Sequence, residues 1–161
     1  ENPTYGTSRV LAAYRDLGRI DDPPAQKGLQ WLAAAQHQDG GWGGAYRTPV
    51  SIEETALATE ALFSHRSYWS SAWRGVKWLL DRIEAERYKE TAPIGFYFAK
   101  LWYAEALYPL IFTVAALRQA QVVSTGRETE RGAVPFDDHT ASIAEVRIAD
   151  AAEENISRST S

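Results

Sequence analysis

Two adjacent carboxylates in the segment SIEETA, Glu53 and Glu54, are residues of a type and spacing that could do acid chemistry. Two acids held side by side can raise the pKa of one of them and so produce a proton donor. The same residues also fit a capping role. Ser51 followed by Glu54 forms a capping box at the start of a helix, where the helix dipole stabilises carboxylates and lowers their pKa. Capping is the favoured interpretation, and proton donation stays open as the alternative.

Other common chemistries find little support in the composition. The 161 residues include no cysteine, and His37, His65 and His139 lie far apart without ligand spacing, so neither a metal nor another cofactor is expected. A net charge of −4 argues against nucleic acid as a partner. No apolar run reaches the roughly 18 residues of a membrane span. The first residue is Glu1 rather than Met, which predicts that the chain is part of a longer protein.

Aromatic residues are the unusual feature of the composition, with six Trp, eight Tyr and five Phe. All of them except Phe136 precede residue 113. The segment 95–117 is apolar nearly throughout, with only Lys100 and Glu105 charged. Such a segment predicts a buried helix, and Pro109 should kink or split it.

The remaining elements must position these residues, and hydrophobic spacing predicts helices for most of them. We expect helices at about 7–17 (capped by Thr7 or Ser8), 24–36, 51–64, 71–87 and 95–117. No strand is expected, so the fold class is all-α, built from paired helices with short links. Residues 121–161 are rich in Ser, Thr, Glu and Arg, which predicts a disordered tail with a short helix around 140–155. The folded domain is therefore expected to cover residues 1–120.

An internal repeat connects two of these helices. KGLQWLAAAQ at 27–36 resembles RGVKWLLDRI at 74–83, 47 residues further on, and only the first copy continues into HQDGGWG. Gln36 lies near a helix end, where its amide can donate to carbonyls that lack helical partners and accept from a neighbouring turn. Trp42 can offer its indole N–H to a carbonyl. We expect a clasp between successive helix pairs, which serves architecture rather than chemistry.

The full motif, K-G-x-x-W-L-x-x-x-Q-x-x-x-G-G-W, resembles the QW motif of squalene–hopene cyclases and the related class II terpene cyclases. Two further stretches resemble the same family, NPTYGTSRVL at the start and GFYFAKLWYAEALYPL from residue 95. The resemblance covers residues 1–120. It implies an (α/α) toroid in which helices alternate around a barrel, and this chain would form an incomplete, carboxy-terminal segment of it.

The resemblance also implies a reaction, the cationic polycyclisation of a polyprene such as squalene in a cavity lined by aromatic residues. Tyr5 matches a tyrosine of the hydrogen-bond network beside the catalytic acid. Phe96 or Tyr97, depending on how the segment is aligned, matches a cavity phenylalanine. Tyr103 matches a cavity tyrosine, and Trp102 is a neighbouring candidate. Aromatic faces stabilise a migrating carbocation by cation–π attraction.

The family's acid belongs to a DxDD motif, which this chain lacks, so we expect the chain to be inactive alone. SIEETA has a similar look to D-x-D-D-T-A but occupies a different repeat. The resemblance further implies a monotopic enzyme at the cytoplasmic side of a membrane, and it leaves homodimer formation open.

Two alternatives accompany this interpretation. The β subunit of protein prenyltransferases shares the toroid but needs a zinc site with a cysteine ligand, which this chain does not offer. A non-catalytic helical repeat module that binds a lipid or a protein partner is the second alternative. The discriminating observation is whether Phe96, Tyr97 and Tyr103 share one concave space with Tyr5.

Overall fold

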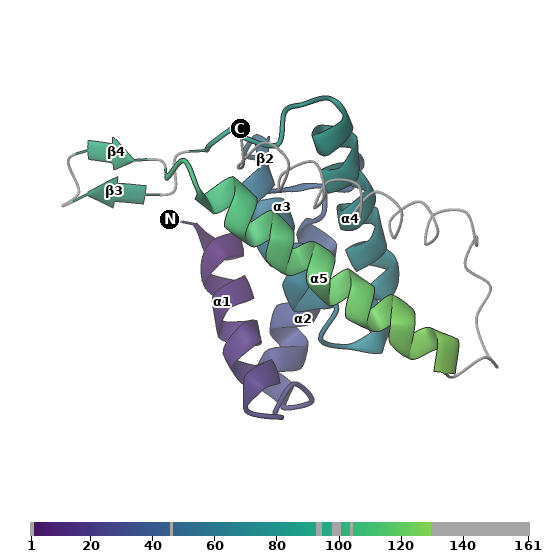
Figure 1. Cartoon of the computed structure of the whole chain (residues 1–161). Coiled ribbons are helices and arrows are strands. Elements are labelled where there is room, and N and C mark those ends of the chain that lie inside the picture. The colour runs from purple at the N-terminus through teal and green to yellow at the C-terminus, as the bar shows by residue number, and fades with distance from the viewer. Residues whose placement is uncertain (1, 46, 93–94, 98–100, 104, 130–161) are drawn as a thin grey trace. The chain divides into compact units, whose positions relative to one another are not determined.

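The computed structural model describes residues 2–45, 47–92, 95–97, 101–103 and 105–129 (Figure 1). The chain divides into two units, Glu1–Ala120 and Gln121–Ser161. The fold is mostly helical, as the sequence predicts, and the helices are α1 (Pro3–Asp16), α2 (Pro23–Ala35), α3 (Ile52–Leu62), η1 (a 3-10 helix, Arg66–Tyr68), α4 (Trp69–Glu84) and α5 (Tyr108–Thr129). The predicted helix at 140–155 lies outside the described residues. Helix α5 continues nine residues into the segment predicted as a tail, and nothing described bears on the rest of that tail.

Helix α1 begins earlier than the hydrophobic spacing predicts. Asn2 is its N-cap, with the side-chain oxygen accepting the Tyr5 backbone N–H at 2.9 Å. Pro3 occupies the first helical position, where its missing N–H costs nothing. The predicted caps, Thr7 and Ser8, therefore lie inside the helix. The predicted cap of α3 is confirmed, since the Ser51 side chain accepts the Glu54 backbone N–H at 3.2 Å.

The predicted helix at 95–117 is wrong in its first half. Two strands, β3 (Gly95–Tyr97) and β4 (Leu101–Tyr103), form an antiparallel hairpin, and α5 begins only at Tyr108. Aromatic residues favour strands as readily as buried helices, so an apolar run does not distinguish the two. Pro109 lies in the first turn of α5, where proline is tolerated, and it marks the start of a helix rather than a kink within one.

Helix α3 forms the centre of the first unit, and ten of its residues are buried. It contacts α1, α2 and α4 (Figure 1). A core cluster joins Ile52 and Ala56 of α3 to Trp78 and Leu79 of α4 and to Ala116 of α5. A second short pairing, which the sequence did not predict, links β1 (Trp42–Gly43) to β2 (Val50–Ser51) and leads directly into α3.

The predicted clasp is present in the structure. The Gln36 amide donates to the carbonyls of Gly40, at 2.8 Å, and of Ser71, at 2.9 Å. Its oxygen accepts from the guanidinium of Arg74 in α4, and not from a backbone N–H. Trp42 is fully buried, and its indole N–H donates to the Leu32 carbonyl at 2.7 Å. The motif therefore ties α2 to α4 and has its tryptophan in the core.

The two copies of the repeat differ in how their tryptophans are covered. Trp78 is 5% exposed, and its indole N–H donates to the Asp39 carboxylate of the preceding copy at 3.1 Å. Trp31, its counterpart, is 39% exposed. The turn that follows one copy of the repeat thus covers the tryptophan of the next copy.

Candidate functional site

The candidate site is built around the first turns of α1 and α3. Asn2 links the two helices, because its amide nitrogen donates to the Glu54 carboxylate at 2.6 Å while its oxygen caps α1 at Tyr5. Thr4 is also fixed: its backbone N–H donates to the Gly44 carbonyl at 3.1 Å, and its hydroxyl donates to the Gly43 carbonyl at 2.7 Å. These bonds hold the Tyr5 backbone against the glycine turn and against α3.

Both carboxylates of SIEETA are buried, with Glu53 0% and Glu54 2% exposed. The Glu54 carboxylate accepts from the Ser51 hydroxyl and from Asn2, and the Glu54 backbone N–H donates to the Ser51 side chain, which confirms Ser51 as the cap. Glu53 accepts the Ala92 backbone N–H at 2.9 Å through one oxygen, and its other oxygen has no partner within the described part of the chain. Each carboxyl therefore holds a different distant segment.

The expectation that the helix dipole lowers the pKa of these carboxyls is wrong. Burial raises the pKa of Glu53, against the bond from Ala92, and the neighbouring Glu54 raises it further. Burial also raises the pKa of Glu54, against the bond from Asn2. Desolvation outweighs the dipole because neither carboxyl reaches water. The pair therefore has the raised pKa that a proton donor would need, and it does not line the hollow between α1 and α2.

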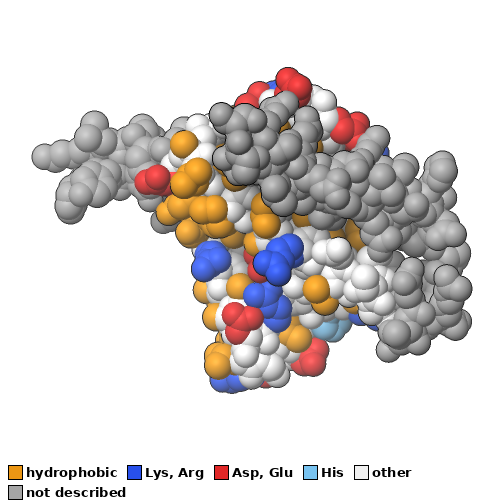
Figure 2. Space-filling view, viewed as in Figure 1, with side chains coloured by type: hydrophobic (Ala, Val, Ile, Leu, Met, Phe, Trp, Pro, Cys, Tyr) orange, Lys and Arg blue, Asp and Glu red, His pale blue; other side chains and the backbone are white. Residues whose placement is uncertain are grey.

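The Tyr5 ring belongs to a small aromatic cluster that the sequence analysis did not single out. It forms a T-shaped pair with Phe112 of α5, with ring centroids 6.4 Å apart and an interplanar angle of 66°. Tyr108, one turn earlier on α5, lies 5.0 Å from the same ring. The four-residue spacing of Tyr108 and Phe112 was visible in the sequence, but their contact with Tyr5 depends on the tertiary fold. On the face shown in Figure 2, hydrophobic side chains gather over the start of α5 and over α1.

The other predicted site residues lie on the β3–β4 hairpin. The Cα atoms of Phe96 and Trp102 are partners in the register, as are those of Tyr97 and Leu101, while Tyr103 is opposite Gly95. The structure describes the backbone of these residues and not their side chains. Whether they share a space with Tyr5 therefore stays a prediction, and so does the choice between Phe96 and Tyr97.

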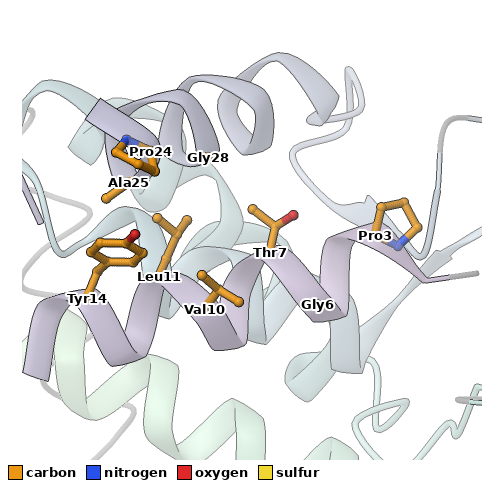
Figure 3. Close-up of a pocket in the computed structure, with 9 residues that line it drawn as sticks. All are labelled: Pro3, Gly6, Thr7, Val10, Leu11, Tyr14, Pro24, Ala25 and Gly28. Atoms are coloured by element: carbon orange, nitrogen blue, oxygen red, sulfur yellow. The ribbon is translucent and has the colours of Figure 1, made fainter. Parts of the chain in front are cut away.

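A separate hollow of about 490 Å³ lies between α1 and α2 (Figure 3). None of the predicted site residues lines it. The lining is largely apolar and consists of Pro3, Gly6, Thr7, Val10, Leu11, Tyr14, Pro24, Ala25 and Gly28. Val10, on its wall, is 56% exposed. The hollow is thus an open apolar groove without a charged group.

Over the parts of the chain that the structure describes, no three His, Cys, Asp or Glu side chains come together as metal ligands would. Within the same ranges, no helix combines the length and the apolar character that crossing a membrane requires.

A mostly helical domain with a clasp of the QW type between helix pairs defines the class of fold, and comparison with known families agrees. Residues 1–122 match the squalene–hopene cyclase C-terminal domain, so the chain belongs to this family. A curated relative is the squalene–hopene cyclase of Bradyrhizobium diazoefficiens, 38% identical over an alignment of 92 residues. The alignment covers 49% of this chain and 14% of that relative, so the chain matches only a small part of its length. No solved structure matches the chain.

Proposed function

We propose that the chain is the carboxy-terminal segment of a squalene–hopene cyclase-like enzyme and forms part of the wall of its reaction cavity. The observation that carries the proposal is the fixed start of α1. Tyr5, which matches a tyrosine beside the family's acid, is held by Asn2 against α3 with its ring against Phe112. The membership of residues 1–122 in the family supports the substrate class, a polyprene such as squalene.

In this proposal the helices belong to an (α/α) toroid that the chain completes only in part. A proton donor, expected on another part of the polypeptide, protonates one end of the polyene. The positive charge then migrates as the rings close, and the faces of Phe96 or Tyr97, Trp102 and Tyr103 stabilise it by cation–π attraction. The cavity must exclude water, which would otherwise trap the cation. The chain alone has no DxDD acid and would not convert the polyprene substrate.

Membrane contact is part of the proposal, because squalene is carried in the bilayer and a peripheral, monotopic enzyme at the cytoplasmic side could draw it from there. The proposal also allows the enzyme to form a homodimer.

The test is to express the intact polypeptide that contains this chain and to incubate it with squalene, with product analysis by gas chromatography and mass spectrometry. We expect cyclised isomers of the substrate. Tyr5→Phe, which keeps the ring against Phe112 and removes the hydroxyl, should slow their formation by about tenfold or more. A polypeptide that includes an acid of the DxDD type and yet cyclises neither squalene nor a shorter polyprene would refute the proposal.

One observation favours a second candidate, a non-catalytic module that binds a lipid. The apolar groove between α1 and α2 is open and is lined by Val10 and Tyr14 (Figure 3). If the groove binds lipid, Val10→Glu should abolish binding of a fluorescent fatty acid, whereas Tyr5→Phe should leave binding unchanged. Cyclisation of squalene that Tyr5→Phe slows, together with fatty-acid binding that Val10→Glu leaves unchanged, would favour the cyclase over the lipid-binding module.

A further inference from the structure

The two buried carboxylates at the start of α3 differ from ordinary capping residues in what they hold. A capping box needs one carboxylate, three residues after the cap, and Glu54 occupies that position after Ser51. Glu53 lies one residue earlier and its side chain has no role in the box. Burial of a carboxyl without a compensating partner is unfavourable, so a fully buried Glu53 requires another explanation.

Glu54 holds the start of α1. Its Oε1 accepts from Asn2, and the other end of the same amide accepts the Tyr5 backbone N–H. Asn2 can satisfy both partners only in one orientation, so the position of α3 fixes where the first turn of α1 lies. Bonds to a carboxylate are also shorter and stronger than bonds between neutral groups.

Glu53 holds the segment that leads to the hairpin. Its Oε1 accepts the Ala92 backbone N–H at 2.9 Å, 39 residues along the chain. Strand β3 begins at Gly95, three residues after Ala92. The bond therefore attaches the approach to β3 and β4 to the same turn of α3 that holds α1.

We propose that Glu53 and Glu54 are positioning residues that fix the two parts of the candidate site relative to each other, Glu54 the Tyr5 end and Glu53 the hairpin end. The effect on catalysis rests on the proposed cyclase function, whereas the effect on the two segments does not. A single turn of α3 sets both positions, so the spacing between Tyr5 and the hairpin depends on two adjacent side chains.

Hydrogen–deuterium exchange on the intact polypeptide tests the positioning. Glu53→Met has a similar volume but no acceptor, and it should speed exchange at the Ala92 amide and across β3 and β4 by about tenfold, the change expected when one buried hydrogen bond is lost. Exchange at the Tyr5 amide should not change. Glu53→Gln keeps an acceptor oxygen and should restore most of the protection.

The other arm of the same experiment uses Asn2→Asp. This variant keeps the oxygen that caps α1, removes the donor to Glu54 and places a second carboxyl group against Glu54, so the link between the two helices is lost. Exchange should rise at the Tyr5 amide and not at Ala92. The control is Glu60→Gln on the same helix, which weakens only the ion pair with Arg15 and should affect neither segment.

Selective loss of protection in the two arms supports the proposal. Equal effects on both segments, or none, would overturn it, because the carboxylates would then act only through general stability. If Glu53→Met does not fold, Ala92→Pro removes the donor of the same bond without altering the core, and exchange is then compared across β3 and β4. Product analysis with squalene is a separate readout: a shift in product ratio for Glu53→Met that Glu53→Gln reverses supports a role in the site, and a polypeptide without cyclase activity refutes the proposed function alone.

Discussion

The glycines at equivalent positions of the repeat, Gly28 and Gly75, should respond in opposite ways to substitution by alanine. A Cβ placed on Gly75 would lie 2.1 Å from the Thr59 hydroxyl oxygen and 3.0 Å from the Trp42 ring. Both neighbours are rigid, because Thr59 is β-branched and Trp42 is fully buried with its indole bonded. A Cβ on Gly28 would lie 3.2 Å from Leu11 Cδ2, the end of a side chain that can move by a few tenths of an ångström.

The magnitude follows from two opposing effects. Replacing a glycine by alanine within a helix stabilises it by roughly 1 kcal/mol at either site. Overpacking a core costs about 1–3 kcal/mol, and a 2.1 Å contact belongs at the upper end of that range. We therefore expect Gly75→Ala to lower the free energy of unfolding by about 1–2 kcal/mol. Gly28→Ala should leave it unchanged or raise it by up to about 1 kcal/mol.

Urea unfolding followed by tryptophan fluorescence and far-UV circular dichroism measures both variants. Thr59→Ala provides the internal control, since the Thr59 hydroxyl has no hydrogen-bond partner among the described residues and its removal opens space for the new methyl group. In the double variant Thr59→Ala/Gly75→Ala, the coupling energy should be favourable by about 1 kcal/mol or more. Equal stabilities of Gly28→Ala and Gly75→Ala, or strict additivity with Thr59→Ala, would refute the close approach of α3 and α4.

Three further predictions use the same unfolding measurement. Trp42→Phe leaves the Leu32 carbonyl buried without its donor and should cost about 1–3 kcal/mol, whereas Trp31→Phe at a partly exposed site should cost under about 0.5 kcal/mol; equal losses would contradict the buried bond. Gln36→Leu removes the donor to two carbonyls and should cost about 1–3 kcal/mol, and a stability equal to that of the wild type would contradict the clasp. Burial raises the pKa of Glu53 above its ordinary value of 4.5, so the folded protein binds a proton that the unfolded chain has already lost. The stability that this proton contributes is fully present below pH 4.5 and is lost as the pH rises through the folded-state pKa. The stability of Glu53→Gln relative to wild type should therefore increase between about pH 4 and pH 8, and a constant difference would show that the carboxyl ionises normally.

The elements that the sequence predicts well are those fixed by local chemistry. The spacing of apolar residues and the Ser51 cap place α3 within two residues of its observed ends. The donors and acceptors of the QW motif were also predictable in kind, because a glutamine at a helix end and an indole in a glycine turn have few partners within reach. The Leu32 carbonyl lies one turn before the end of α2, where such a partner is available.

The predictions from the sequence are wrong where the local conformation depends on tertiary contacts. The run from Gly95 is apolar enough for a buried helix or a strand, and nothing in its own residues chooses between them. The Asn2 cap was missed because its second bond, to Glu54, depends on a residue 52 positions away. The raised pKa of Glu53 was only the less favoured alternative for a similar reason: sequence position indicates a helix start, whereas the burial that raises the pKa depends on the elements packed around α3.

Three consecutive residues of α3 together contact both the QW motif and the candidate site. Glu53 holds Ala92, Glu54 holds Asn2, and the next residue, Thr55, exchanges hydrogen bonds with the Trp42 backbone, accepting at 2.9 Å and donating at 3.3 Å. The tryptophan that makes the motif recognisable has no predicted contact with substrate. Its backbone is nevertheless hydrogen-bonded to Thr55, the residue that follows the two carboxylates in the first turn of α3. Changes at the QW motif should therefore disturb the Tyr5 end and the hairpin together, whereas changes at either carboxylate should disturb one of them.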